Sequence, residues 1–309
     1  MAWLEITVNT APETIDKVCA ELTAGGFDDL LIEDQQEFET FLDQNKAYWD
    51  YIDEQLQEKL QGLSRIKLYL EDTDKKGLAR LEALLKNMDL TPTIETMPET
   101  DWETSWQDNY PPQPVGEKLV VLPCWLADTE TNRLPVILDP GLTFGTGAHP
   151  STQMVLEAME ENVIPGAATL DLGSGSGILS IAALRLGAGK AVGVDIDPKA
   201  EDIARENAAY NDFAAPAFTA CTGNVLSDKK LMERLAAQHW DLVLVNIVAD
   251  VIISLAPVLP RLMDKNSRLI LSGILDVRLP DVEQAIKKAG LTVKNTRAKE
   301  EWRCLEVIL

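Results

Sequence analysis

Residues 168–184 carry the feature that most constrains the fold, an apolar run that reaches three glycines and continues into a helical pattern. Gly173, Gly175 and Gly177 separate the two parts. Glycines at such a turn let a ligand approach the backbone, and the first turn of the helix offers free N–H groups. Ile178 stands where a dinucleotide fingerprint needs glycine, and the Lys-Ser/Thr pair of a P-loop is missing. Since many glycine turns bind nothing, the neighbouring segments have to indicate whether this turn binds a ligand.

Strand and helix signals alternate from residue 136 to the carboxyl end. This alternation predicts an α/β domain with a doubly wound, mainly parallel, seven-stranded sheet and helices on both faces. The predicted strands are 168–172, 191–195, 217–221, 241–246, 268–272, 291–296 and 303–308.

Residues 1–97 have a different order, β-α-β-β-α-β, which is typical of an α+β ferredoxin-like domain. Residues 98–135 hold three tryptophans and six prolines, which predicts a structured connector. We therefore expect three parts, 1–97, 98–135 and 136–309. In the first part we expect strands at 3–8, 29–33, 65–70 and 91–97, helices ending at Leu22 and spanning 78–88, and a helical insertion at 45–61.

The charge of the chain restricts its partners. It has 309 residues, with 50 acidic and 28 basic side chains and a net charge of −22, and residues 1–100 alone hold 22 acidic and 9 basic ones. This charge repels phosphate backbones, so nucleic acid is not expected as the primary target. A basic protein is a natural partner, although an acidic excess can also serve solubility alone.

Composition also limits location and metal chemistry. The chain lacks an uncharged stretch of about 18 residues and an amino-terminal basic and apolar signal, so we expect a cytoplasmic protein without a membrane span. The four cysteines are scattered, and the only histidines are His149 and His239. No metal site is therefore expected, and the cysteines suit small buried apolar positions.

Asp195 ends the second predicted strand of the sheet, 22 residues after Gly173. In nucleotide-binding α/β folds an acidic residue at this place binds ribose hydroxyls. Pro198 is suited to begin the next helix, and Asp197 before it suits a turn or cap. The alternative for Asp195 is likewise a turn or cap.

Two more segments carry polar groups toward the same edge of the sheet. Asn246 ends an apolar strand and can orient an amine, or it can cap a helix over 248–259. The loop 138–152 contains three glycines within seven residues beside Phe144 and His149, so it can fold over a ligand. Thr152 opens the following helix. His149 can carry a proton or, with Pro150 beside it, orient the loop.

Together these segments resemble a known family. The run Asp-Leu-Gly-Ser-Gly-Ser-Gly at 171–177, followed by Val-Asp-Ile-Asp-Pro at 194–198, resembles class I S-adenosyl-L-methionine (SAM)-dependent methyltransferases. With the segments at 139–141, 144–152, 246–249 and 271–275, the whole chain resembles the ribosomal protein methyltransferases that modify large-subunit protein eleven. It departs from their usual pattern at Gln107, Thr143, Ser151 and Ser174, where Lys, Ala, Thr and Cys are common.

The resemblance implies a cofactor, a substrate and a set of site residues. The cofactor is SAM, the product S-adenosyl-L-homocysteine, and the substrate the lysine ε-amines and N-terminal α-amine of the basic ribosomal protein, free or on the ribosome. The amino-terminal domain is implied to recognise that protein. We expect Asn246 to orient the amine, with His149 as the alternative proton acceptor. The implied cofactor contacts are Phe144, Gly145, Thr146, Gly147, Thr152, Asp171, Gly173, Gly175, Gly177, Asp195, Ile196 and Asn246.

Three alternatives remain open from sequence. A nucleic-acid methyltransferase would share the cofactor turns but should carry a basic face. A glutamine methyltransferase of release factors should show Asn-Pro-Pro-Tyr, whereas residues 246–249 read Asn-Ile-Val-Ala. A non-enzymatic cofactor-binding assembly module would show the same motifs without methyl transfer.

Overall fold

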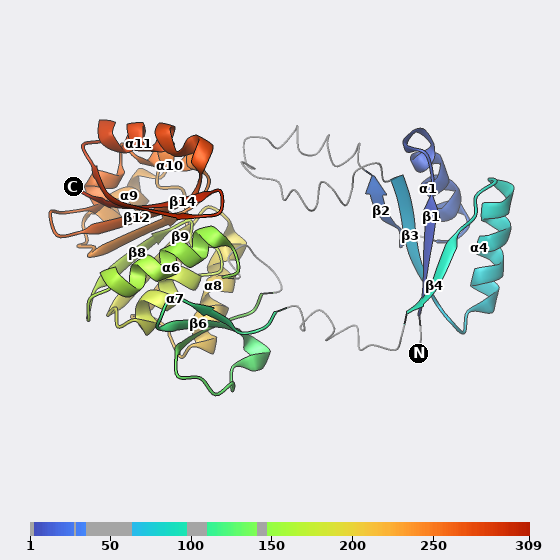
Figure 1. Cartoon of the computed structure of the whole chain (residues 1–309), viewed down its shortest axis with the longest axis horizontal. Coiled ribbons are helices and arrows are strands. Elements are labelled where there is room, and N and C mark those ends of the chain that lie inside the picture. Colours follow the sequence, from blue (N-terminus) through green and yellow to red (C-terminus); the bar gives the residue numbers. More distant parts are fainter. Residues whose placement is uncertain (1–2, 28, 35–63, 98–109, 141–146) are drawn as a thin grey trace. The chain divides into compact units, whose positions relative to one another are not determined.

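A computed structural model of the chain describes residues 3–27, 29–34, 64–97, 110–140 and 147–309. The chain divides into two compact units, Met1–Asp108 and Asn109–Leu309 (Figure 1). Across the described ranges no helix is both long and apolar enough to span a membrane. The helical insertion predicted at 45–61 lies outside these ranges.

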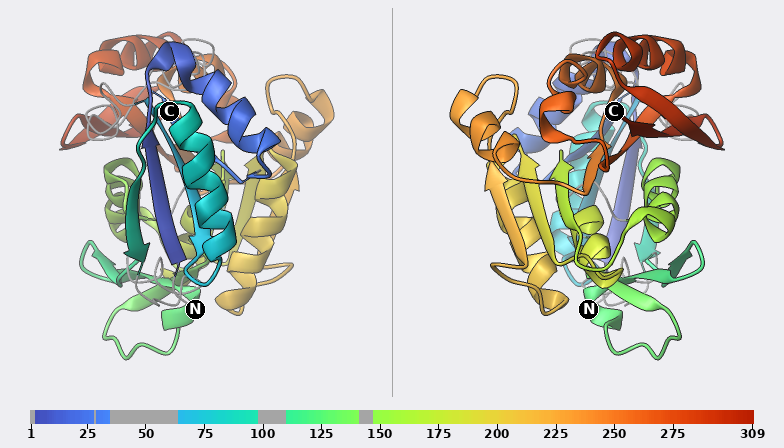
Figure 2. Two further views of the ribbon diagram at one scale, coloured as in Figure 1. Left: turned by 90° about the vertical axis from the view of Figure 1, so that its right-hand side faces the viewer. Right: turned by 90° about the vertical axis from the view of Figure 1, so that its left-hand side faces the viewer.

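The first unit contains an antiparallel sheet with strand order β2-β3-β1-β4. Alternate residues of its central strands, such as Ile6 and Leu68, are buried against Leu22, Leu81 and Leu85 of the two helices. The helices lie on this one face (left view of Figure 2). The predicted ferredoxin-like order is therefore present. Its elements are β1 (Trp3–Asn9), η1 (Pro12–Thr14), α1 (Ile15–Ala24), β2 (Leu31–Asp34), β3 (Ser64–Glu71), α4 (Lys75–Asn87) and β4 (Thr93–Met97).

The second unit is built on a seven-stranded sheet of order β10-β9-β8-β11-β12-β14-β13. Only β14 runs against the others. The seven predicted strands are confirmed, and β12 and β13 extend further at their carboxyl ends. The strands are β8 (Ala168–Leu172), β9 (Lys190–Asp195), β10 (Phe218–Thr222), β11 (Leu242–Asn246), β12 (Arg268–Leu275), β13 (Thr292–Lys299) and β14 (Trp302–Ile308).

Helices flank this sheet on both faces, as Figure 1 shows. Leu170 and Leu172 of β8 join an apolar core with the last three helices, whereas Asp171 between them bonds to Ser180 on the opposite side. This two-residue period of a strand places Asp171 on the side of β8 opposite to that apolar core. The helices are α6 (Pro150–Asn162), α7 (Ile178–Arg185), α8 (Pro198–Tyr210), α9 (Lys229–Ala236), α10 (Ala249–Leu255) and α11 (Leu279–Lys288), with short turns η4 (Leu259–Leu262) and η5 (Asp276–Arg278).

Part of the predicted connector forms a three-stranded sheet that sequence reasoning did not identify. It consists of β5 (Gln113–Val115), β6 (Leu119–Pro123) and β7 (Leu134–Leu138), with the turn η3 (Cys124–Leu126) after β6. The boundary predicted at residue 136 falls inside β7. Residues 98–109 of the connector lie outside the described ranges.

Two buried asparagines, Asn207 in α8 and Asn211 at its C-cap, hold the free edge of β7. Asn211 accepts a hydrogen bond from the Ile137 N–H at 2.9 Å and donates to its carbonyl at 2.7 Å, as a neighbouring strand would. Asn207 accepts from the Asp139 N–H at 2.8 Å and donates to the Ser176 carbonyl at 2.8 Å. Asn211 thus holds β7 to the end of α8, and Asn207 links Asp139 to the glycine turn.

His239 lies between two carboxylates of this unit. Its Nε2 lies 2.9 Å from Asp241 Oδ1, and its Nδ1 lies 2.8 Å from Asp264 Oδ2. The hydrogen bond to Asp241 and the charges of both carboxylates raise the pKa of His239.

We therefore predict that the His239 contribution is complete below about pH 6.5 and is lost as pH rises through the raised folded-state pKa. Urea unfolding of the wild type and of His239→Gln between pH 5 and 9 measures it. The wild type should lose stability relative to the variant over that window. Parallel pH curves for the two proteins would contradict the assignment.

Candidate active site at the carboxyl edge of the large sheet

The glycine turn after β8 is fixed by the neighbouring strand. The N–H groups of Gly173 and Ser174 donate to the Val194 carbonyl at 2.8 and 3.2 Å. Gly173 has φ 76°, and an added Cβ there would lie 2.4 Å from the Ile247 side chain. The turn thus combines left-handed backbone with close approach, which only glycine accommodates. It leaves backbone, rather than side chains, to face a ligand.

Asp195 is held beside this turn by two backbone donors. Its Oδ2 accepts from the Gly175 N–H at 2.9 Å, and its Oδ1 accepts from the Asp197 N–H at 3.0 Å. Each carboxylate oxygen has a second lone pair for a hydroxyl. Asp197 itself caps α8 through the Lys199 N–H at 2.9 Å, as the sequence suggested. The apolar side chain of Ile196 is 69% exposed beside Asp195, where it can contact a ligand.

Asp171 is a fully buried acid with one unused oxygen. Its Oδ2 accepts from the Ser180 hydroxyl at 2.9 Å and the Ser180 N–H at 3.2 Å. Its Oδ1 is buried and has no hydrogen-bond partner among the described residues. Burial raises the pKa of Asp171 to about 7, the bonds from Ser180 oppose this rise, and the charge of Asp195 adds to it. An unpaired buried acceptor of this kind suits a cationic donor.

Asn246 ends β11, the strand on the other side of β8. Its Nδ2 donates a hydrogen bond to Thr152 Oγ1 at 3.1 Å. The amide oxygen of Asn246 is therefore the atom that can accept a hydrogen bond from a ligand. The alternative role as a helix cap is not seen, because α10 begins after Val248 and has no side-chain cap. Thr152 lies in the first turn of α6 and is almost fully buried.

His149 is the N-cap residue of α6. Its Nδ1 accepts from the Ser151 N–H at 3.2 Å and lies 2.7 Å from Ser151 Oγ. Its ring meets Trp302 edge-on at 4.5 Å between centroids. Burial lowers the pKa of His149, and the charges of Glu301 and Glu300 oppose this.

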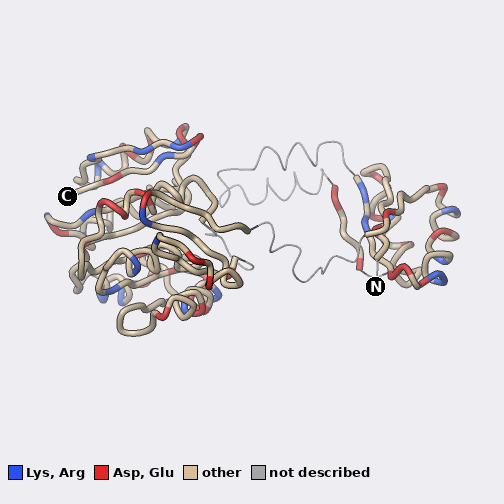
Figure 3. Tube along the Cα trace, turned by 60° about the horizontal axis from the view of Figure 1, so that its bottom comes forward, with Lys and Arg blue, Asp and Glu red and all other residues tan. Residues whose placement is uncertain are grey.

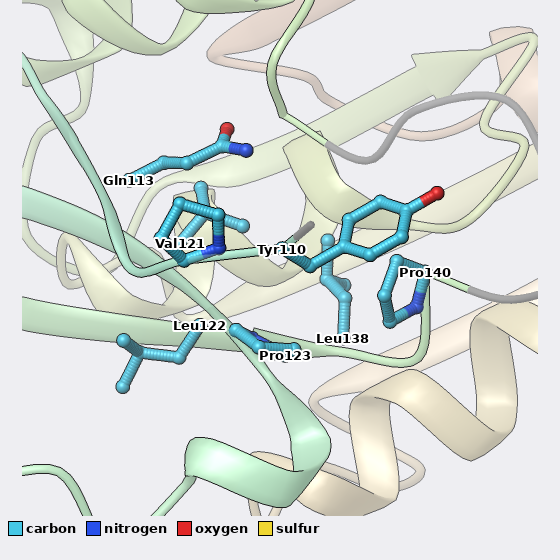
Figure 4. A pocket seen from close by; sticks show the side chains of 8 residues that line it. Tyr110, Gln113, Val121, Leu122, Pro123, Leu138 and Pro140 are labelled. Atoms are coloured by element: carbon cyan, nitrogen blue, oxygen red, sulfur yellow. The ribbon is translucent and has the colours of Figure 1, made fainter. Parts of the chain in front are cut away.

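Gly147 and a small apolar hollow lie at the entrance to α6. Gly147 has φ 88°, and an added Cβ would lie 3.0 Å from Val121. Val121 also lines the hollow shown in Figure 4, with Tyr110 and Pro140 among the other walls. The hollow therefore adjoins the predicted ligand loop. Three loop residues expected to contact the cofactor, Phe144, Gly145 and Thr146, lie outside the described ranges.

The parallel pairing of three strands brings these groups to one edge. β8 lies between β9 and β11, so the glycine turn, Asp195 and Asn246 follow neighbouring strand ends. The strand order reverses here, where doubly wound sheets bind ligands. Sequence reasoning missed the supporting residues Ser180, Asn207, Asn211 and Ser272. The two asparagines, four residues apart on an otherwise small-residue helix face, were a signal that could have been read. No group of three or more His, Cys, Asp or Glu able to hold a metal occurs among the residues described.

Asp171 should make the unliganded protein less stable as pH rises. Its folded pKa exceeds the ordinary value, so its contribution is favourable below about pH 4 and is lost between about pH 4 and the folded value of about 7. Relative to Asp171→Asn, the wild type should lose unfolding free energy on the order of 4 kcal/mol at most over that window. Urea titrations measure this difference, and Asp202→Asn, at an exposed carboxylate, is the control. A constant difference between wild type and Asp171→Asn would refute it.

Comparisons with known proteins agree with this geometry. The profile of the family "Ribosomal protein L11 methyltransferase (PrmA)" matches residues 2–308. A relative named ribosomal protein L11 methyltransferase from Alkaliphilus oremlandii is 32% identical over 319 residues, covering 99% of this chain and 98% of that relative. One of the same name from Pseudomonas aeruginosa is 36% identical over 306 residues, covering 98% and 97%.

A solved structure supports the same assignment. The crystal structure of a ribosomal protein L11 methylase from Lactobacillus delbrueckii subsp. bulgaricus is 29% identical, with a TM-score of 0.58. It covers 64% of this chain and 98% of that chain. With a family profile that spans nearly all residues and relatives above 30% identity over the full length, the chain belongs to the ribosomal protein L11 methyltransferase (PrmA) family.

Proposed function

We propose that this protein transfers methyl groups from SAM to the lysine ε-amines and the N-terminal α-amine of ribosomal protein L11. Membership of the family makes it a SAM-dependent protein methyltransferase. The observation that carries the proposal is the meeting of a glycine turn, Asp195 and the Asn246–Thr152 pair at adjacent strand ends, in a chain that matches the family throughout. We place the reaction in the cytoplasm, on L11 either free or ribosome-bound.

The residues present fit the cofactor. The two oxygens of Asp195 can each accept one ribose hydroxyl while keeping their backbone donors. The unused Oδ1 of Asp171 suits the ammonium of the methionine portion, and Gly173 and Gly175 let that portion approach the backbone. When bound, SAM supplies a methyl group that its sulfonium already activates.

The protein then has to align the amine and favour its uncharged form. A lysine amine titrates near 10.4 and an α-amine near 8, so lysine in particular has to lose a proton before attack. A site sheltered from water favours the neutral amine. The amide oxygen of Asn246 can accept an N–H of that amine and aim its lone pair at the methyl group. The proton passes to water.

We assign recognition of L11 to the amino-terminal domain, residues 1–97. Its described part has a core of its own and carries none of the cofactor groups. Acidic and basic positions are interspersed along it, with an acidic excess over residues 1–100 (Figure 3). An acidic surface attracts a basic partner and raises the rate of encounter.

Asp195→Ala should weaken SAM binding by about 2 kcal/mol, the size of hydrogen bonds to a charged group. Calorimetry on the folded variant measures the affinity. Asp197→Ala is the matched control, because it removes only the side chain that caps α8, worth about 1 kcal/mol of stability, and keeps the backbone N–H that donates to Asp195. Equal affinities of the wild type and Asp195→Ala for SAM would contradict the proposal that Asp195 binds the ribose.

A fragment of residues 109–309 should keep SAM binding, since the glycine turn and strand ends all lie in that unit. It should methylate whole L11 far more slowly than the full chain, because the proposed recognition domain is missing. Labelled SAM and ribosome-free L11 measure the rates of both proteins. Full-length enzyme that labels no amine of L11 would overturn the proposed function. A fragment as fast as the full chain would overturn only the role of residues 1–97.

A further inference from the structure

We propose that His149 is a positioning residue: its uncharged ring caps α6 through Nδ1 and thereby fixes Thr152 as the partner of Asn246. This inference rests on the proposed function. It replaces the alternative in which His149 removes the proton from the amine.

Nδ1 of His149 lies 3.2 Å from the Ser151 nitrogen and 2.7 Å from Ser151 Oγ. We assign Nδ1 as the acceptor of the Ser151 N–H, in keeping with its place at the N-cap, and this assignment puts the proton of the neutral ring on Nε2. In this tautomer neither nitrogen is a ready base: Nδ1 is occupied, and Nε2 is a donor. A protonated ring would direct Nδ1–H at the Ser151 N–H and abolish the cap. It would also place a cation at the positive end of a helix.

The capped turn is held from several sides, so it can serve as a rigid mount. Ser272 Oγ donates to the Ser151 carbonyl at 3.0 Å. Gln153 donates to the Ala148 carbonyl at 3.0 Å and accepts from Lys299. Trp302 supports the face of the turn through its edge-on contact with His149. Thr152 of this turn faces β11, and its hydroxyl oxygen accepts the hydrogen bond from Asn246 Nδ2.

The same arrangement predicts an acid-sensitive step. The charged groups that act on His149 are Glu300 and Glu301, from the turn between β13 and β14, and both favour its protonation. Burial of the ring outweighs them and lowers the pKa of His149, so the cap is intact at neutral pH. It is lost as pH falls through this lowered value.

Full-length wild type, His149→Ala and His149→Asn test the proposal by two readouts. Calorimetry gives the affinity for S-adenosyl-L-homocysteine from pH 5 to 8.5, and labelled SAM gives turnover on L11. At pH 8, His149→Ala should bind roughly tenfold more weakly, because a first turn of α6 that has lost a cap worth about 1 kcal/mol of helix stability no longer holds Thr152, an expected cofactor contact. His149→Asn should recover most of that loss, because asparagine is a good N-cap that does not titrate. Circular dichroism confirms that both variants are folded.

The pH dependence separates a cap from a base. As pH falls, the affinity of the wild type for S-adenosyl-L-homocysteine should decrease more steeply than that of His149→Asn. Any pH dependence of the affinity that comes from Asp171 is present in both proteins. Loss of turnover by more than a hundredfold in both variants, with unchanged affinity, would identify a base and overturn the proposal. Unchanged affinity and turnover in both would overturn it too. If no protein methylates L11 but the affinities follow the expected order, positioning is supported and only the proposed function fails.

Discussion

The site depends on the parallel pairing of β8 with β9 on one side and β11 on the other. Parallel strands end at the same edge, so three short sequences that lie far apart in the chain deliver their polar ends together. Backbone bonds from Gly173 and Ser174 to Val194 then extend this ladder beyond the last strand residue. A ligand at this edge meets groups whose positions are set by the backbone of the sheet.

Asp171 shows the energetic side of this arrangement. A buried acid beside a second carboxylate is unfavourable for folding, and Ser180 satisfies only one of its oxygens. Apolar residues surround it in β8, so packing alone would favour a neutral side chain. A cationic ligand would supply the missing partner of Oδ1, so ligand binding would offset the cost of burying this acid.

Much of this could be read from sequence because the central strands β8, β9, β11 and β12 contain apolar runs, and because α6, α7, α8 and α9 begin at or directly after Pro, Gly or Asp. Asp195 and Asn246 were identifiable because they directly follow such runs. The small sheet β5–β7 was not, since prolines at 114, 123 and 135 suggest a connector, and β6 is buried along its whole length and so lacks the alternation typical of a half-buried strand. The pairing of Asn246 with Thr152 also escaped prediction, because a contact across 94 residues leaves no local pattern. For His149 the sequence left two roles open, and only the geometry of Nδ1 favours one.

The asparagines of α8 affect more than the position of the glycine turn. β7 is an edge strand, and an edge with unpaired N–H and C=O groups is a template on which another chain can add a strand. Asn211 occupies both groups of Ile137, so a helix side chain closes this edge where a further strand would otherwise be needed. A chain that lost this side chain would leave the N–H and C=O groups of Ile137 without these partners, at an edge where Val136, Ile137 and Leu138 are buried. The buried amide thus protects the edge of a sheet in the way that a further strand would.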